Sequence, residues 1–110
     1  MKWAAVRLAC SDSAGTSHKA GIAELLWLPD GGMLIAATTS DSRKHSKAGA
    51  LWHVRDASVR NGTLNAMKWR AYPALKPEGL ALTPDGSAIT VVFDLGKKEP
   101  MWAELPWPRR

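Results

Sequence analysis

The chain has 110 residues, of which 45% are hydrophobic and 23% charged, and a formal net charge of +5. These values are typical of one globular domain over residues 1–110, and no apolar stretch reaches the roughly 18 residues that a membrane-spanning helix requires. A single cysteine, Cys10, excludes an intramolecular disulfide, and this usage favours a reducing, cytoplasmic compartment.

The first expected element is a strand over residues 2–10, "KWAAVRLAC", where Trp3, Ala5 and, less regularly, Leu8 mark the apolar side. No hairpin partner precedes it. The stretch that follows, residues 11–21, is rich in serine and glycine and predicts a flexible connection. No GxSxG motif surrounds Ser17, so its neighbour His18 is expected to be solvated or structural.

Residues 26–41, "LWLPDGGMLIAATTSD", place Pro-Asp-Gly between two apolar runs. Pro29 presets the first central position of a turn, Asp30 tolerates the second, and Gly31 takes the left-handed position that closes a hairpin. A helix over residues 18–28 is the competing interpretation, but Gly21 and Pro29 would limit it to about two turns. The segment therefore predicts strand–turn–strand.

Two further strands are expected after a polar loop at residues 40–47. The first is "GALWHV", residues 49–54, and the second is "NAMKWRAYP", residues 65–73, whose apolar positions alternate. Since His53 follows Trp52 on a strand, the two side chains should point to opposite faces.

The hairpin pattern returns 55 residues further along the chain, in "LALTPDGSAITVVFD", residues 80–94. The two stretches align without a gap, so that Gly86 falls on Gly31 and Ile89 on Leu34. A third strand, "PMWAEL", residues 100–105, then places Trp102 at the position of Trp52. The sequence therefore predicts repeat units over residues 21–56 and 76–105.

The order of strand, Pro-Asp-Gly, strand, polar loop and "LW" strand resembles a β-propeller blade. "KPEGLALTPDGSAITVVFD" in particular is similar to blades of bacterial propellers related to esterase-like phytases and lactonases. The resemblance implies an all-β fold of two four-stranded antiparallel blades; a small β-sandwich or barrel is the alternative. Propellers have about 4–8 blades, so two blades imply a homo-oligomer, a dimer or a trimer, that covers the remaining faces.

One cation site follows from the resemblance. In lactonase-like propellers an acidic residue near the position of Glu78 can bind a divalent cation, which implies Ca²⁺ at Glu78. Such a site needs several oxygen ligands, and the sequence offers only Glu24 and Asp12 besides; a solvated carboxylate is the simpler interpretation. The spacing of His18, His45 and His53 matches no metal motif.

A basic cluster of Arg43, Lys44 and Lys47 is the candidate for binding anions. No RNA-binding motif accompanies it, so nucleic acid is not the expected partner.

Taken together, the sequence favours a non-catalytic binding or scaffolding module that associates with itself. The alternatives are a lactonase- or phosphoesterase-like enzyme with a site completed by oligomerisation, and an anion or nucleic-acid binder that acts through residues 43–47. No residue is assigned a catalytic role.

Overall fold

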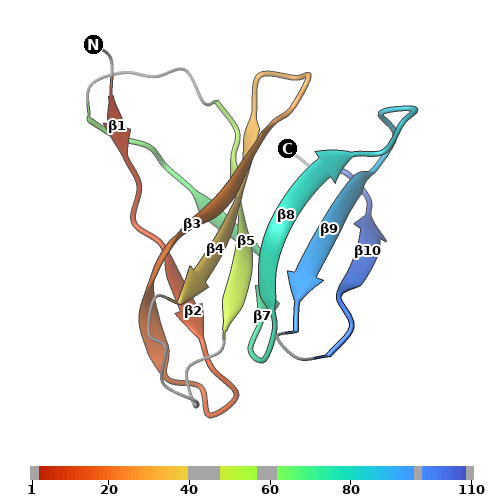
Figure 1. The fold of residues 1–110 in the computed structure, drawn as a ribbon. Helices are drawn as coiled ribbons and strands as arrows, with labels where there is room; N and C mark the ends of the chain where they lie inside the picture. Colours follow the sequence, from red (N-terminus) through yellow and green to blue (C-terminus); the bar gives the residue numbers. More distant parts are fainter. Residues whose placement is uncertain (1–2, 40–47, 57–61, 96–97, 109–110) are drawn as a thin grey trace.

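The computed structural model describes residues 3–39, 48–56, 62–95 and 98–108, and these residues form strands, turns and loops but no helix (Figure 1). Among them, therefore, no helix is long and apolar enough to cross a membrane. The strands are β1 (Ala4–Ala5), β2 (Ala9–Ser11), β3 (Ser17–Trp27), β4 (Met33–Thr39), β5 (Gly49–Val54), β6 (Gly62–Thr63), β7 (Met67–Tyr72), β8 (Lys76–Leu82), β9 (Ile89–Asp94) and β10 (Met101–Leu105).

The strands form two antiparallel sheets and one short parallel pair. The first sheet has the order β2-β3-β4-β5-β7, the second sheet has the order β10-β9-β8, and β1 pairs with β6. The predicted all-β class is confirmed, and residues 18–28 are strand and not helix. The strands divide five and three where four and four were expected, because β2 of the N-terminal segment pairs with β3 and so belongs to the first sheet.

Both Pro-Asp-Gly segments form the predicted hairpin turns. Gly31 has a φ of 89° and Gly86 a φ of 74°, and the amide of each donates to the carbonyl three residues earlier, over 3.1 Å and 2.8 Å. Glycine adopts this left-handed conformation without the steric cost that a Cβ would bring. The backbone at these two positions therefore requires glycine.

The second hairpin has one more residue in its turn than the first. The Leu28 amide donates to Gly32 at 2.9 Å, whereas the Thr83 amide reaches one residue further, to Ala88 at 3.0 Å. The two hairpins otherwise correspond pair by pair: Trp27–Met33 with Leu82–Ile89, and Leu25–Ile35 with Leu80–Val91. The structure therefore matches Ile89 with Met33, not with Leu34 as the gapless alignment predicts.

This shift also changes the match between the third strands. Trp102 pairs with Val92, and the equivalent pair of the first sheet is Leu51 with Ala36. Trp102 thus corresponds to the buried Leu51, and the expected match with Trp52 is replaced.

The β4 strand is buried on both faces, which explains its uninterrupted apolar run. On one face, here called the N-terminal face, Met33, Ile35 and Ala37 pack against Leu8 and Cys10. On the other, the contact face, Leu34, Ala36 and Leu51 pack against Ile89, Val91 and Phe93 of the second sheet. The described residues thus form two apolar cores, one on each side of the first sheet.

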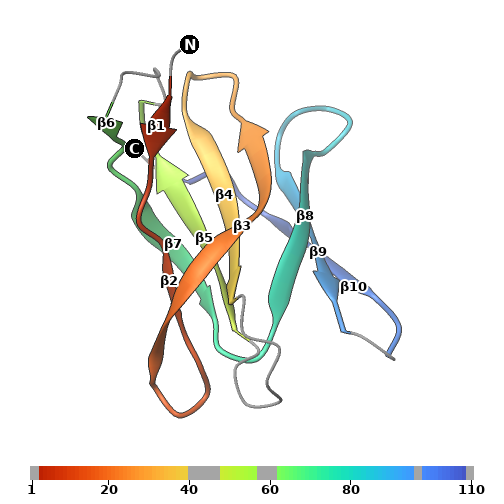
Figure 2. The ribbon, with the colours of Figure 1, turned by 60° about the vertical axis from the view of Figure 1, so that its left-hand side comes forward.

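The first sheet curls, because β2 at one edge contacts β7 at the other (Figure 2). The second sheet lies beside the contact face, where β8 contacts β3, β4 and β5. Tyr72 and Phe93 pack edge to face across this boundary, with ring centroids 4.9 Å apart. At the C-terminal end, Trp107 Nε1 donates to the carbonyl of Gly86 at 3.1 Å, which ties the chain after β10 to the second turn.

Candidate functional site

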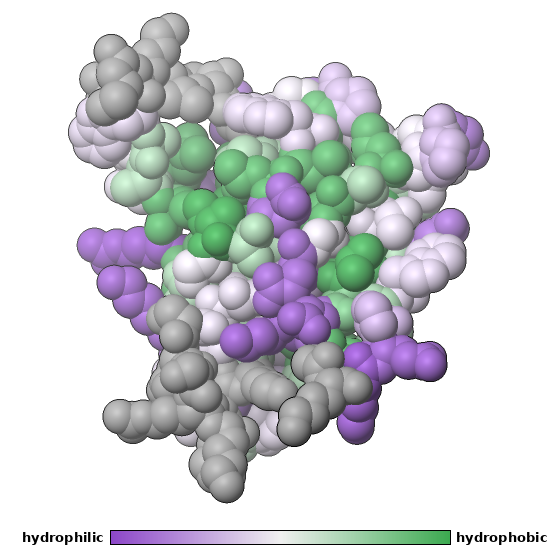
Figure 3. All heavy atoms as spheres, viewed as in Figure 1, coloured by the Kyte–Doolittle hydropathy of each residue, from purple (hydrophilic) through white to green (hydrophobic). Residues whose placement is uncertain are grey.

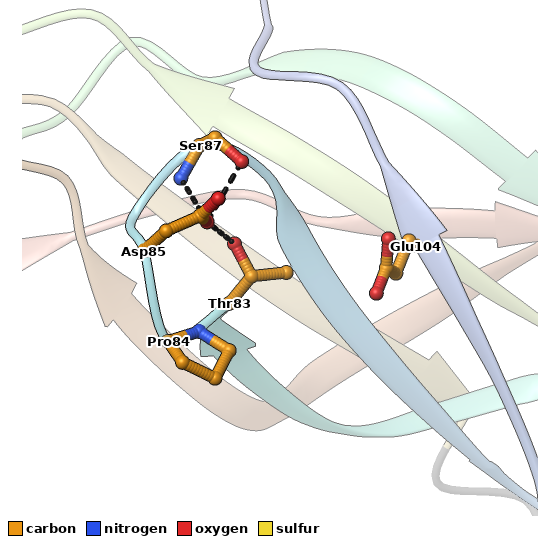
Figure 4. Close-up of a pocket in the computed structure, with 5 residues that line it drawn as sticks. All are labelled: Thr83, Pro84, Asp85, Ser87 and Glu104. Carbon is orange, nitrogen blue, oxygen red and sulfur yellow. Dashed lines mark hydrogen bonds between the residues drawn. The ribbon is translucent and has the colours of Figure 1, made fainter.

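A hollow of about 330 Å³ lies at the turn between β8 and β9. It is lined by Thr83, Pro84, Asp85 and Ser87 of the hairpin and by Glu104 of β10 (Figure 4). The hydroxyls of Thr83 and Ser87 both donate to Asp85 Oδ1 at 2.8 Å, and the Ser87 amide donates to the same oxygen at 3.0 Å. These polar groups of the hairpin thus stabilise the turn by binding one another.

These hydrogen bonds stabilise the ionised form of Asp85. The Ser87 amide is the main cause, followed by the Ser87 and Thr83 hydroxyls, and together they lower the pKa of Asp85 from 3.8 to about 2. An acid or base that works near neutral pH needs a pKa close to the pH at which it works. Asp85 is therefore suited to shaping the turn and not to proton transfer.

A second polar cluster orders the turn between β2 and β3. Asp12 Oδ2 lies 2.7 Å from His18 Nε2, and Asp12 Oδ1 accepts from the amides of Ala14 and Thr16 at 2.9 Å and 3.0 Å. The His18 hydrogen bond is the main cause of a lowered pKa at Asp12, and the Thr16 amide is the next. The flexible connection predicted here is wrong, since residues 12–16 form a tight hairpin turn in which Gly15 has a φ of 83°.

The structure places Glu78 on β8, at a bulge between Pro77 and Gly79 where the ladder to β9 shifts by one residue. Its side chain is exposed, as is that of Glu24, which accepts from the Leu25 amide at 3.1 Å. Asp12 is held by His18 instead. Within the described ranges, no three His, Cys, Asp or Glu side chains come together as a group that could hold a metal ion. The Ca²⁺ site at Glu78 stays a prediction.

The basic cluster and one histidine lie outside the described residues: Arg43, Lys44, Lys47 and His45. The other two histidines have structural positions. His18 pairs with Asp12, and His53 is buried on the contact face opposite Leu34. Trp52 packs instead into the core of the N-terminal face, which confirms that the two neighbours point to opposite sides of the strand.

Two cation–π contacts lie along β7 and were not predicted from the sequence. Lys68 Nζ lies 5.3 Å from the ring centroid of Trp52, its cross-strand partner, and Arg70 Cζ lies 4.8 Å from that of Trp69. The alternation of basic and aromatic residues in "KWR" was the available signal. Such contacts contribute about 0.5–1 kcal/mol each at exposed sites. We therefore assign them a role in stabilising the sheet and not in binding a ligand.

Apolar side chains are exposed on two sheet surfaces, and exposed apolar surface of this kind indicates a binding site for a partner. The outer face of the second sheet, turned away from the first sheet, carries Val92 and Trp102, which is 63% exposed. On β3, Ile22, Leu25 and Trp27 form an exposed row, here called the β3 row. Figure 3 shows how apolar surface spreads over one side of the molecule between hydrophilic side chains.

No protein-family model, curated protein or solved structure matches the chain. We base the proposed function on the exposed apolar surfaces, because Thr83, Asp85 and Ser87 in the polar hollow are hydrogen-bonded to one another.

Proposed function

We propose that the chain is a non-catalytic binding or scaffolding module, built from two propeller-like repeat units, that associates with copies of itself. One observation carries the proposal. Trp102 is 63% exposed on a sheet face, although Leu51, at the equivalent position of the first sheet, is fully buried against a second sheet. A large side chain left exposed loses about 1.5–3 kcal/mol of burial energy, which a partner sheet would recover.

Three details of the hairpins support a common repeat unit. Both turns have a glycine with positive φ at the same place. Both first strands have their ladder shift at the same place, between Ile22 and Glu24 in β3 and between Pro77 and Gly79 in β8. In both turns the aspartate accepts from the amide two residues later, at 2.9 Å for Asp30 and 3.0 Å for Asp85.

For the assembly we propose a dimer, because twofold oligomers are the most common, with a trimer as the alternative. We propose a cytoplasmic location, because a chain with a single cysteine forms no intramolecular disulfide and needs no oxidising compartment for one.

Light scattering coupled to size-exclusion chromatography tests the proposal. We expect a mass of two or three chains at micromolar concentration and a shift towards one chain on dilution. A single chain over the whole concentration range would contradict self-association. For the alternative cation site, a calcium-dependent rise in melting temperature that Glu78→Gln abolishes would support ligation by Glu78.

A further inference from the structure

We propose that the outer face of the second sheet binds the β3 row of a second copy, a head-to-tail contact that a closed dimer makes twice and a closed trimer three times. The inference rests on the proposed self-association and names its two surfaces. It follows from the way the two sheets pack within one chain.

Inside the chain, two strands of the second sheet contribute to the contact: β8 lies next to the first sheet, and β9 adds the buried side chains of Ile89, Val91 and Phe93. β8 lies against β3, β4 and β5, and its Leu80 and Leu82 join the apolar core that Leu34, Ala36 and Leu51 form on the contact face. The interface therefore joins apolar side chains of β8 and β9 to an apolar face made by β3, β4 and β5 of the first sheet.

Each side of this interface has an equivalent that is exposed. In the matched ladders, Leu25 and Trp27 of β3 occupy the positions of Leu80 and Leu82 of β8. Trp27 is nevertheless 57% exposed and Leu25 41%. The apolar row of β8 thus packs against a sheet, whereas the equivalent row of β3 is exposed.

The outer face is the equivalent of the contact face. Val92 and Trp102 form the cross-strand pair that corresponds to Ala36 and Leu51, and Gly79, the partner of Val92 on β8, adds no side chain beside them. A strand can therefore approach this part of the outer face closely.

The N-terminal segment covers much of the first sheet, so that on this face only β3 is exposed to a second copy. Val6, Leu8 and Cys10 cover the N-terminal face around Met33 and Ile35. β2 pairs with β3 only through residues 17–19, so that the β3 row lies beyond it. The exposed β3 row is therefore the part of the equivalent surface that the N-terminal segment leaves open to a second copy.

Paired charge variants test this arrangement. Trp102→Asp removes one surface and Trp27→Asp the other, and Met67→Asp is the matched control, because Met67 is 65% exposed but belongs to neither surface. Ile22→Asp and Val92→Asp repeat the test at a second residue of each surface. Circular dichroism establishes that each variant is folded before its mass is measured by light scattering.

We expect Trp102→Asp and Trp27→Asp each to have the mass of a single chain, while Met67→Asp keeps the mass of the unmodified protein. An equimolar mixture of the first two should then form a one-to-one complex, because each retains the surface that the other lacks. That complex has one interface in place of two and should dissociate at higher concentration than the unmodified assembly.

Two results would overturn the proposal and leave self-association intact. If Trp27→Asp keeps the unmodified mass while Trp102→Asp does not, two outer faces bind each other. If both variants keep it, the interface lies elsewhere. An unmodified protein that remains a single chain would overturn the proposed function together with this inference.

Discussion

Gly31 and Gly86 have φ angles of 89° and 74°, in the region that side chains with a Cβ avoid. We expect Gly31→Val or Gly86→Val to lower the free energy of unfolding by about 1 kcal/mol or more. Gly21→Val is the control, because Gly21 lies in β3 without a positive φ and a Cβ there would have no neighbour within 4 Å. Urea denaturation measures all three, and equal losses at the three positions would contradict the turn assignment.

Asp85 makes the stability of the second hairpin depend on pH. Because folding lowers the pKa of Asp85 from 3.8 to about 2, the stabilisation is complete above pH 3.8 and is lost as the pH falls towards about 2. Asp85→Asn should therefore differ most from the unmodified protein at neutral pH, with the difference in melting temperature shrinking in acid. A titration midpoint near 3.8 for the Asp85 carboxyl carbon, measured by NMR, would contradict this.

Among the strands, β5 begins at a position where no side chain fits. A Cβ on Gly49 would lie 2.7 Å from the carbonyl oxygen of Leu75, in the backbone that joins β7 to β8, and would also meet Pro77. Gly49→Ala should cost about 1–3 kcal/mol, as overpacking does. Gly79→Ala is the matched control, since its Cβ would meet Val92 at an ordinary 3.5 Å; comparable losses for both would show that the two sheets approach less closely at Gly49.

β4 separates two cores, so substitutions at neighbouring residues of this strand should lower the stability by similar amounts. Leu34 and Ile35 are both fully buried but point to opposite faces of the sheet. Leu34→Ala and Ile35→Ala should each lower stability by about 2–5 kcal/mol, while Leu25→Ala, in the exposed β3 row, should cost a dissociated chain far less. Thermal unfolding of dilute protein measures the series, and a tolerant Ile35→Ala would contradict a packed N-terminal face.

The hairpins could be predicted from the sequence because their signals are local. Pro-Asp-Gly between apolar runs determines turn chemistry over four residues. The register could not, because it depends on how the backbone closes each turn: Leu28 reaches Gly32, and Thr83 reaches Ala88. The β2–β3 hairpin was missed although Asp12 and Gly15 are favoured at the first and last positions of a type I turn; the serine-rich context concealed them.

The proposed association of copies depends on the exposed side chains of Trp27 and Trp102. The sequence places Trp27 and Trp102 in strands, but periodicity alone cannot say which face meets another sheet. That depends on the one-residue shift, which turns Ile89, Val91 and Phe93 towards the first sheet and leaves Val92 outside. For the proposed site the sequence thus identifies the residue types, and only the packing of the two sheets identifies the surfaces.

The most direct test is an isotope-filtered NOE experiment on a mixture of labelled and unlabelled chains, which detects contacts between copies only. Head-to-tail association predicts intermolecular NOEs from the indole protons of Trp102 to the methyl groups of Ile22 and Leu25 in the second copy. Intermolecular NOEs that join Trp102 to Val92 or to a second Trp102, with none to the β3 row, would contradict it.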